Sequence, residues 1–110
     1  MKLAVIGSRG LTSIDIGKYI PKNVTEIVSG GAKGIDVLAK QYALVNNLKL
    51  VEFLPDYSKF GRFAPLKRNQ DIVNYADEVF AFWDGKSKGT KYVIDYCEKT
   101  SKKCTIINLV

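Results

Sequence analysis

The sequence predicts an α/β domain built around a mainly parallel sheet of about five strands. Short apolar runs alternate with segments of helical periodicity along the whole chain. Three of the apolar runs end in glycine-bearing turns, which are typical of strand-to-helix connections at a ligand-binding edge. Right-handed crossovers between parallel strands place helices on both faces of the sheet. The predicted fold is therefore a three-layer, doubly wound, Rossmann-like domain.

The first half of the chain begins this alternation. Residues 2–6 form a short apolar run rich in β-branched side chains, which is typical of a buried strand. Residues 11–20 follow with a short helical pattern, and residues 26–28 form a second apolar run. Over residues 34–46, apolar side chains recur on one helical face, which predicts an amphipathic helix.

The second half repeats the pattern and ends on a strand. It predicts strands, helices and a last strand over residues 50–54, 66–75, 78–83, 90–99 and 105–109. Residues 55–63 form a connecting loop with many aromatic and basic side chains, which is unusual for a plain connector. We interpret this loop as a candidate lid.

Composition limits the kinds of protein this chain can be. Its 110 residues, 46% of them hydrophobic, are enough for one core and show no linker, so we expect a single domain over residues 1–110. No apolar run approaches the roughly 20 residues that span a bilayer, and no leader pattern opens the chain. We therefore expect a cytoplasmic protein with no membrane partner.

The ionisable residues favour an anionic partner. A net charge of +6 results from 17 basic and 11 acidic side chains. An alternative interpretation is that Lys99, Lys102 and Lys103 simply complement a helix C-terminus. The absence of histidine and the presence of only two cysteines disfavour a metal site, a cofactor held by metal ligands and a disulfide framework. Without histidine, any chemistry would use carboxylates, tyrosines, lysines or arginines.

Two glycine-bearing turns follow the first two predicted strands. The turn at residues 7–10 contains Arg9, which can bind a phosphate in bidentate fashion, although a plain turn with a solvated arginine remains an alternative. The turn at residues 29–36 brings three glycines to a helix N-terminus, where free amides and the helix dipole attract anions. Asp36 has two interpretations here, a contact to a ribose hydroxyl or a cap on the first helical turn.

Two further segments complete the predicted site. Residues 84–90 combine lysines, glycines and hydroxyls into a second candidate phosphate cradle, and the alternative is a polar loop with Thr90 as helix cap. Lys67 and Arg68 lie in the first turn of a predicted helix, where cations oppose the helix dipole. A nearby anion would explain them, and a solvated pair is the alternative.

These segments, taken in order, resemble one known superfamily. GSRG, SGGAKGID, KRN and GKSKGT, which begin at residues 7, 29, 67 and 85, resemble the SLOG superfamily over nearly the whole chain. That group includes the DNA-processing protein A (Smf) proteins and the lonely-guy phosphoribohydrolases. With PDYSKFGR added, the likeness is greatest to the short stand-alone Rossmann-like members of unsettled function. The resemblance implies a pocket at the strand ends for nucleotides, nucleotide-derived signals or nucleic-acid phosphates.

The turns, the loop and the resemblance together define one set of candidate ligand- and phosphate-binding residues. They are Gly7, Ser8, Arg9, Ser29, Gly30, Gly31, Ala32, Lys33, Gly34, Asp36, Tyr57, Lys67, Arg68, Asn69, Asp84, Gly89 and Thr90. No catalytic residue is predicted, because the glutamate that the lonely-guy enzymes use after their PGGxGT loop has no counterpart here. Asp36, Asp56 and Asp84 stay open as substitutes, since no spacing selects one.

The leading functional hypothesis is a sensor or carrier that binds a phosphorylated nucleotide or an ADP-ribose-like molecule, without a cofactor. One alternative is an N-glycosidic nucleotide hydrolase or transferase of the lonely-guy type. Another is single-stranded DNA binding, as in DNA-processing protein A, with Tyr57, Phe60 or Trp83 as stacking faces. Core packing is the competing explanation for Trp83 and its neighbours. The resemblance also implies a homodimer or a higher homo-oligomer.

Overall fold

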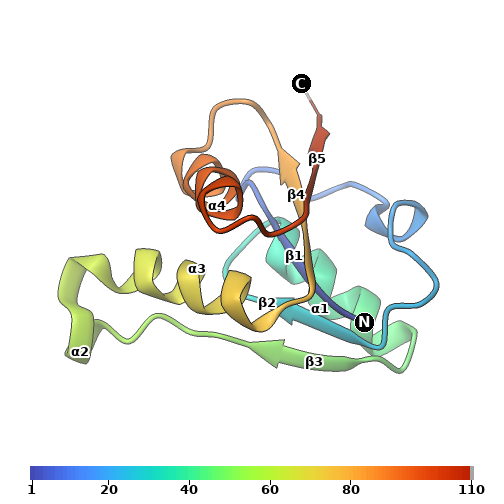
Figure 1. Ribbon diagram of the computed structural model, residues 1–110. Coiled ribbons are helices and arrows are strands. Elements are labelled where there is room, and N and C mark those ends of the chain that lie inside the picture. The colour runs from blue at the N-terminus through green and yellow to red at the C-terminus, as the bar shows by residue number, and fades with distance from the viewer. Residues whose placement is uncertain (110) are drawn as a thin grey trace.

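All five strands lie parallel in a single sheet. The computed structural model describes residues 1–109 and orders the strands β3-β2-β1-β4-β5 (Figure 1). Their bounds are β1 Lys2–Gly7, β2 Glu26–Ser29, β3 Lys49–Glu52, β4 Glu78–Trp83 and β5 Cys104–Asn108. The chain runs outward from β1 to β3 and then returns to the other side of β1. The strand order therefore reverses between β1 and β4, where open α/β sheets bind their ligands.

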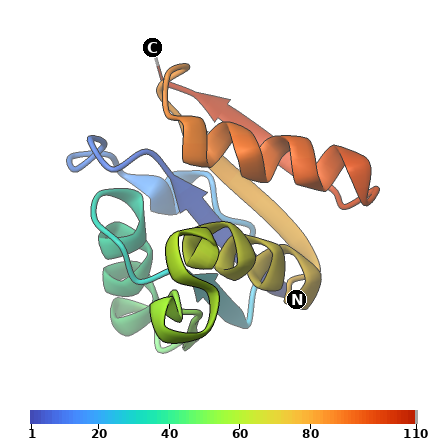
Figure 2. The same cartoon turned by 90° about the vertical axis from the view of Figure 1, so that its left-hand side faces the viewer.

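Helices cover both faces of this sheet (Figure 2). One face is covered by α1, Ile35–Val45, together with the 3-10 turn η1, Ile16–Lys18. The other is covered by α3, Ala64–Tyr75, and α4, Lys88–Lys99. The prediction of a three-layer, doubly wound, Rossmann-like fold is thus confirmed. Within residues 1–109, no helix is long and apolar enough to cross a membrane.

Strand β1 shows how the sequence builds two cores at once. Successive side chains on a strand point to opposite faces of the sheet. Leu3 and Val5 pack into the cluster under α1, whereas Ala4 and Ile6 pack into the cluster under α3 and α4. All four are buried, so β1 reads as a continuous apolar run, as expected for a central parallel strand.

The predicted helix over residues 11–20 is wrong. Only the three residues of η1 are helical there, and the flanking chain is irregular. Gly17 and several β-branched side chains disfavour a helix in so short a segment, which could not repay the cost of nucleation. The apolar spacing has another cause, because Ile16 and Ile20 are buried in the core beneath the sheet without a regular helix.

The segment predicted as a loop, residues 55–63, contains two short helical turns. These are α2, Tyr57–Phe60, and η2, Gly61–Phe63. Asp56 caps α2 by accepting a hydrogen bond from the Lys59 amide at 3.2 Å. The segment between β3 and α3 therefore has a defined backbone, which holds Tyr57 in place.

The start of α4 also differs from the prediction. The helix begins at Lys88 rather than at residue 90, and Ser87 is its N-cap. The Ser87 hydroxyl accepts a hydrogen bond from the Thr90 amide at 3.4 Å. Thr90 is therefore inside the first turn and is not the cap. Other bounds agree more closely: β4 has the predicted limits, and α1 is one residue shorter than predicted at each end.

Candidate functional site

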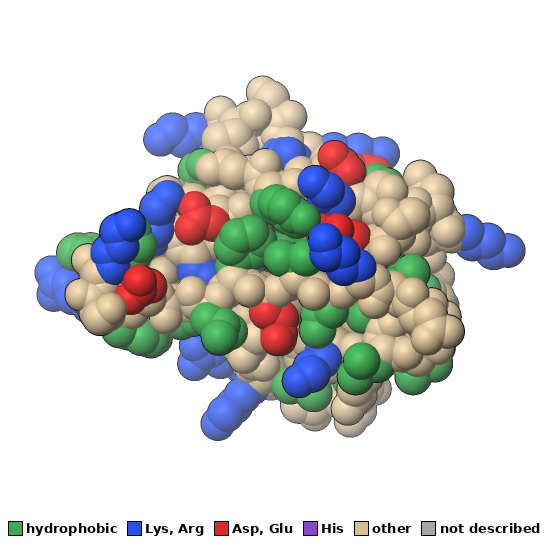
Figure 3. All heavy atoms as spheres, turned by 90° about the horizontal axis from the view of Figure 1, so that it is seen from below, with side chains coloured by type: hydrophobic (Ala, Val, Ile, Leu, Met, Phe, Trp, Pro, Cys, Tyr) green, Lys and Arg blue, Asp and Glu red, His purple; other side chains and the backbone are tan. Residues whose placement is uncertain are grey.

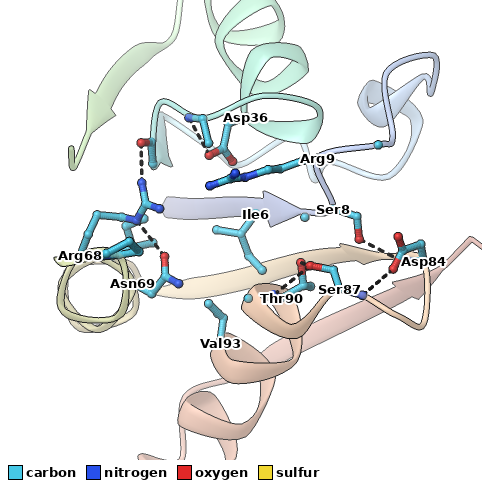
Figure 4. A pocket seen from close by; sticks show the side chains of 17 residues that line it. Ile6, Ser8, Arg9, Asp36, Arg68, Asn69, Asp84, Ser87, Thr90 and Val93 are labelled. Atoms are coloured by element: carbon cyan, nitrogen blue, oxygen red, sulfur yellow. Dashed lines mark hydrogen bonds between the residues drawn. The ribbon is translucent and has the colours of Figure 1, made fainter. Parts of the chain in front are cut away.

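A cavity of about 400 Å³ opens at the carboxyl ends of β1 and β4, where the strand order reverses (Figure 4). Its base is apolar and is formed by Ile6, Ile72 and Val93, and its walls are mostly polar. The residues that line it are Ile6, Gly7, Ser8, Arg9, Gly10, Gly30, Ala32, Asp36, Pro65, Arg68, Asn69, Ile72, Asp84, Ser87, Gly89, Thr90 and Val93. We call this the β1–β4 cavity.

A second cavity of about 340 Å³ adjoins the first on the side of β3. Both are lined by Arg9, Gly30, Ala32 and Arg68, so these residues form a shared wall. The second cavity is completed by Gly31, Lys33, Leu54, Pro55 and Tyr57. We call this the Tyr57 cavity.

Figure 3 shows the face of the molecule that lies below in Figure 1. Hydrophobic side chains are exposed on this face, with charged side chains, among them lysine and arginine, around them.

Arg68 projects from α3 into this shared wall and ties three elements together. Its Nη1 donates to the Gly30 carbonyl at 2.6 Å and to the Phe53 carbonyl at 3.5 Å, at the ends of β2 and β3. Its Nε donates to the Asn69 side-chain oxygen at 2.8 Å. In the described chain, no hydrogen bond engages Nη2, so part of the guanidinium remains available to a ligand. Burial lowers the pKa of Arg68, opposed by the charge of Asp36.

Bare backbone at Gly30 makes room for Arg68. A Cβ at Gly30 would lie 2.5 Å from Nη1 of Arg68, so any side chain there would displace the guanidinium from this position. Gly34 is required for a different reason, because its φ of 69° is a conformation that L side chains rarely adopt. Its backbone also packs against the Ser8 carbonyl at the end of β1. The glycines of this turn therefore serve packing inside the protein.

Asp36 is buried beside Arg68 in the first turn of α1. Its Oδ2 accepts a hydrogen bond from the Ala32 amide at 3.0 Å, so it orders the turn that precedes its own helix. Burial raises the pKa of Asp36, and the Ala32 amide and the charge of Arg68 offset this only in part. A carboxylate of the chain thus occupies one of the amides, that of Ala32, that the sequence suggested for a phosphate.

The turn at residues 84–90 is closed in the same way, by its own side chains. Asp84 Oδ1 accepts from the Lys86 and Ser87 amides, each at 2.8 Å. These amide bonds, that of Ser87 first, lower the pKa of Asp84. The turn is also joined to β1, because the Asp84 amide donates to the Ser8 hydroxyl at 3.2 Å. The amides of Lys86, Ser87 and Thr90 are therefore already paired.

Arg9 is the exposed cation of the site. Its side chain extends from the end of β1 over Ile6 toward Asp36 and Arg68 (Figure 4). The positive charge of Arg9 is one of the influences that lower the pKa of Arg68, so the two guanidinium groups are close enough to repel each other. No salt bridge engages Arg9 or Arg68 in residues 1–109. Two guanidinium groups in this arrangement can bind an anion between them.

The structure brings most of the predicted site residues to one or other cavity. The exceptions are Ser29, Gly34 and Lys67. Ser29 is fully buried and accepts a hydrogen bond from the Gly31 amide at 3.3 Å. Lys67 pairs with Asp71 at 2.9 Å, one turn along α3. Of the three aspartates considered as catalytic substitutes, Asp36 and Asp84 line the β1–β4 cavity, whereas Asp56 lines neither cavity.

Sequence reasoning missed several residues of these walls. They are Ile6, Gly10, Leu54, Pro55, Pro65, Ile72, Ser87 and Val93. Ser87 could have been found, because serine is a preferred N-cap and it stands three residues before Thr90. For the apolar residues, nothing in the sequence separates a side chain at the base of a cavity from one in the core.

Comparisons with known proteins identify one family. The family model of DNA recombination-mediator protein A matches residues 1–65, more than half of the chain. This region includes β1, β2, β3 and α1, together with Arg9 and Tyr57. Arg68 and the turn at residues 84–90 lie beyond it. Comparisons with curated proteins and with solved structures give no significant match.

Proposed function

This chain belongs to the DNA recombination-mediator protein A family, and from that premise we propose that it binds single-stranded DNA at the β1–β4 cavity. A backbone phosphate of the strand binds between Arg9 and Arg68, at the wall that both cavities share. The sugar attached to that phosphate packs on the apolar base of the cavity. This is the DNA-binding alternative from the sequence, assigned to one place in the structure.

The observation that carries the proposal is that Arg9 and Arg68 both line the wall that the two cavities share. Arg9 is exposed, and Arg68 keeps Nη2 outside the hydrogen bonds of the described chain. Holding two such groups together costs electrostatic free energy, which a phosphate recovers by accepting hydrogen bonds from both. The net charge of +6 adds a long-range attraction for a polyanion.

Asp36 sets a limit on this attraction. Its carboxylate lines the same cavity, so an ionised Asp36 repels the phosphate that the arginines attract. Arg68 compensates part of that charge, whereas Arg9, the other cation that lines the β1–β4 cavity, makes no salt bridge in the described chain. We therefore expect Arg9 to contribute most to phosphate binding.

Fluorescence anisotropy with a labelled oligothymidylate tests this assignment. We expect Arg9→Ala to weaken binding about tenfold, the loss typical of one charged hydrogen-bonding partner. Arg62→Ala is the matched control, because Arg62 is an exposed arginine that lines neither cavity. Wild-type affinity should fall steeply as salt is raised, and the dependence should be shallower in Arg9→Ala. Equal losses in the two variants would show that the DNA contacts the surface at large and not the cavity.

A free nucleotide or ADP-ribose-like ligand is the second candidate, and the concave shape of the site favours it. The β1–β4 cavity, at about 400 Å³, is large enough for a small ligand and combines an apolar base with a few polar groups. A sensor or carrier role, in a single domain of the short stand-alone SLOG type, would follow from such binding. Competition decides between the two: saturation by a mononucleotide at lower concentration than the oligonucleotide would favour the free ligand.

A further inference from the structure

We propose that the Tyr57 cavity binds a second base, so that the site as a whole recognises a dinucleotide unit of single-stranded nucleic acid. One nucleoside occupies each cavity, and the phosphodiester that joins them lies at Arg9 and Arg68. This inference rests on the proposed function, because it takes the strand to be the ligand of the β1–β4 cavity. It adds the number of nucleotides recognised and the residue that contacts the second base.

The first support is the position of the shared wall. Arg9 and Arg68, the two cations that the phosphate needs, line both cavities. A phosphate held there has one neighbouring nucleoside on each side, as a phosphodiester does. At about 400 and 340 Å³, each cavity lies near the lower end of small-ligand sites, so each suits one nucleoside.

The second support is the chemistry of the Tyr57 cavity. Leu54 and Tyr57 are 66% and 60% exposed, although both are large apolar or aromatic side chains. Two such side chains beside Pro55, with Lys33 on the same cavity, combine a stacking surface with a cation. Nucleobases stack on aromatic rings while their phosphates bind cations, and this mode tolerates any base because every base has a π-face.

The third support is the way Tyr57 is held. Asp56 caps α2 through the Lys59 amide and the Ser58 hydroxyl, which lies 2.7 Å from Asp56 Oδ1. The backbone that carries Tyr57 is therefore ordered before a ligand arrives. Tyr57 and Arg68 also line the same cavity. A base on Tyr57 thus keeps its phosphate within reach of Arg68.

The experiment compares ligands of equal charge that differ by one nucleoside. Thymidylyl-thymidine and the methyl ester of thymidine 5′-monophosphate each carry one phosphodiester charge, but only the first has a second base. Dissociation constants are measured by calorimetry for the wild-type protein and for Tyr57→Ala. We expect the wild type to bind the dinucleotide about tenfold more tightly than the methyl ester, as one stacked base typically adds. Tyr57→Ala should remove that preference and leave methyl-ester affinity unchanged.

Two control variants make this result specific. Tyr57→Phe keeps the ring and should keep the preference. Phe63→Ala removes an aromatic ring that is 57% exposed but lines neither cavity, and it should change neither affinity. Circular dichroism checks that each variant is folded, which we expect because both rings are exposed.

The outcomes separate this inference from the proposed function. Arginine-dependent binding of oligothymidylate, with equal affinities for the dinucleotide and the methyl ester, would overturn the inference and leave the proposed function standing. An equal loss for both ligands in Tyr57→Ala would also overturn it, because Tyr57 would then act on the shared phosphate. Failure of any oligonucleotide to bind would overturn the proposed function and the inference together.

Discussion

The turn after β2 and the turn after β4 use the same local device with opposite electrostatic results. In each, an aspartate accepts hydrogen bonds from backbone amides just before or inside a helix. The pKa of Asp84 is lowered by those bonds, whereas burial raises the pKa of Asp36 despite them. The carboxylate of Asp84 thus finds its amide partners within its own turn. The turn after β2 depends on Arg68, which is 38 residues away from Gly30 in the chain.

From that difference we expect anion binding to affect one turn more than the other. Adding an anion near Asp84 changes little, because the carboxylate is already satisfied by its own loop. An anion bound near Asp36 would compete with that buried carboxylate for the positive charge of Arg68. We therefore expect stability, pH dependence and binding to be linked at the turn after β2 and not at the turn after β4.

The largest expected effect is on stability, and it tests the comparison between the two turns. Arg68→Ala should lower the free energy of unfolding by roughly 2 kcal/mol, because it removes charged hydrogen bonds to two strand ends and leaves Asp36 uncompensated. Asp84→Ala should cost less, since the hydrogen bonds of its carboxylate lie within its own loop. Urea denaturation of both variants measures these costs, and a larger loss in Asp84→Ala would reverse the assignment of the dependent turn.

A smaller effect, on pH dependence, sharpens the comparison. Burial holds the folded-state pKa of Asp36 above the ordinary value of 3.8, so the native protein binds a proton there more tightly than the unfolded chain does. As the pH falls through that raised pKa, the native state takes up a proton and gains stability relative to the unfolded chain. Asp84, with a lowered pKa, should lose its stabilising contribution as the pH falls from above 3.8 through its folded value. Unfolding curves of Asp36→Asn and Asp84→Asn, each against the wild type, should show these opposite slopes.

The same titration should appear in binding. Protonation of Asp36 removes a negative charge from the cavity, so oligonucleotide affinity should rise as the pH falls toward the raised pKa of Asp36. Asp36→Asn should bind more tightly than wild type at neutral pH and show a flatter profile. Asp84→Asn is the control and should keep the wild-type slope. A wild-type slope in Asp36→Asn would mean that another group titrates with the ligand.

The smallest expected effect separates Arg68 from its neighbour in the sequence. Lys67 pairs with Asp71 in a partly exposed contact one turn along α3 and lines neither cavity. Lys67→Ala should lower stability less than Arg68→Ala or Asp84→Ala, as is typical for the loss of an exposed pair at this spacing, and should change DNA affinity less than twofold. A loss of affinity as large as that of Arg9→Ala would show that Lys67 belongs to the binding surface.

Local patterns were sufficient for much of the fold and for the location of the site. β4 is a six-residue segment in which Glu78 is followed by five apolar residues, and its predicted limits agree with the structure. The glycine-bearing turns were found because strand ends of parallel sheets meet at one edge. Residues 11–20 were misjudged because apolar spacing alone does not distinguish a helix from an irregular segment that packs Ile16 and Ile20.

The sequence by itself determined the layer order, the sheet edge that carries the site, and the cations and turns gathered there. It did so because strand period, helix period and turn chemistry are local properties of the chain. Only the tertiary structure decided that Arg68 would donate hydrogen bonds at the ends of β2 and β3. It also decided that Asp36 would accept a hydrogen bond from the Ala32 amide in the turn before its own helix. It likewise decided that Tyr57 would line a second cavity. These outcomes depend on burial and on contacts between distant segments, which no local pattern encodes.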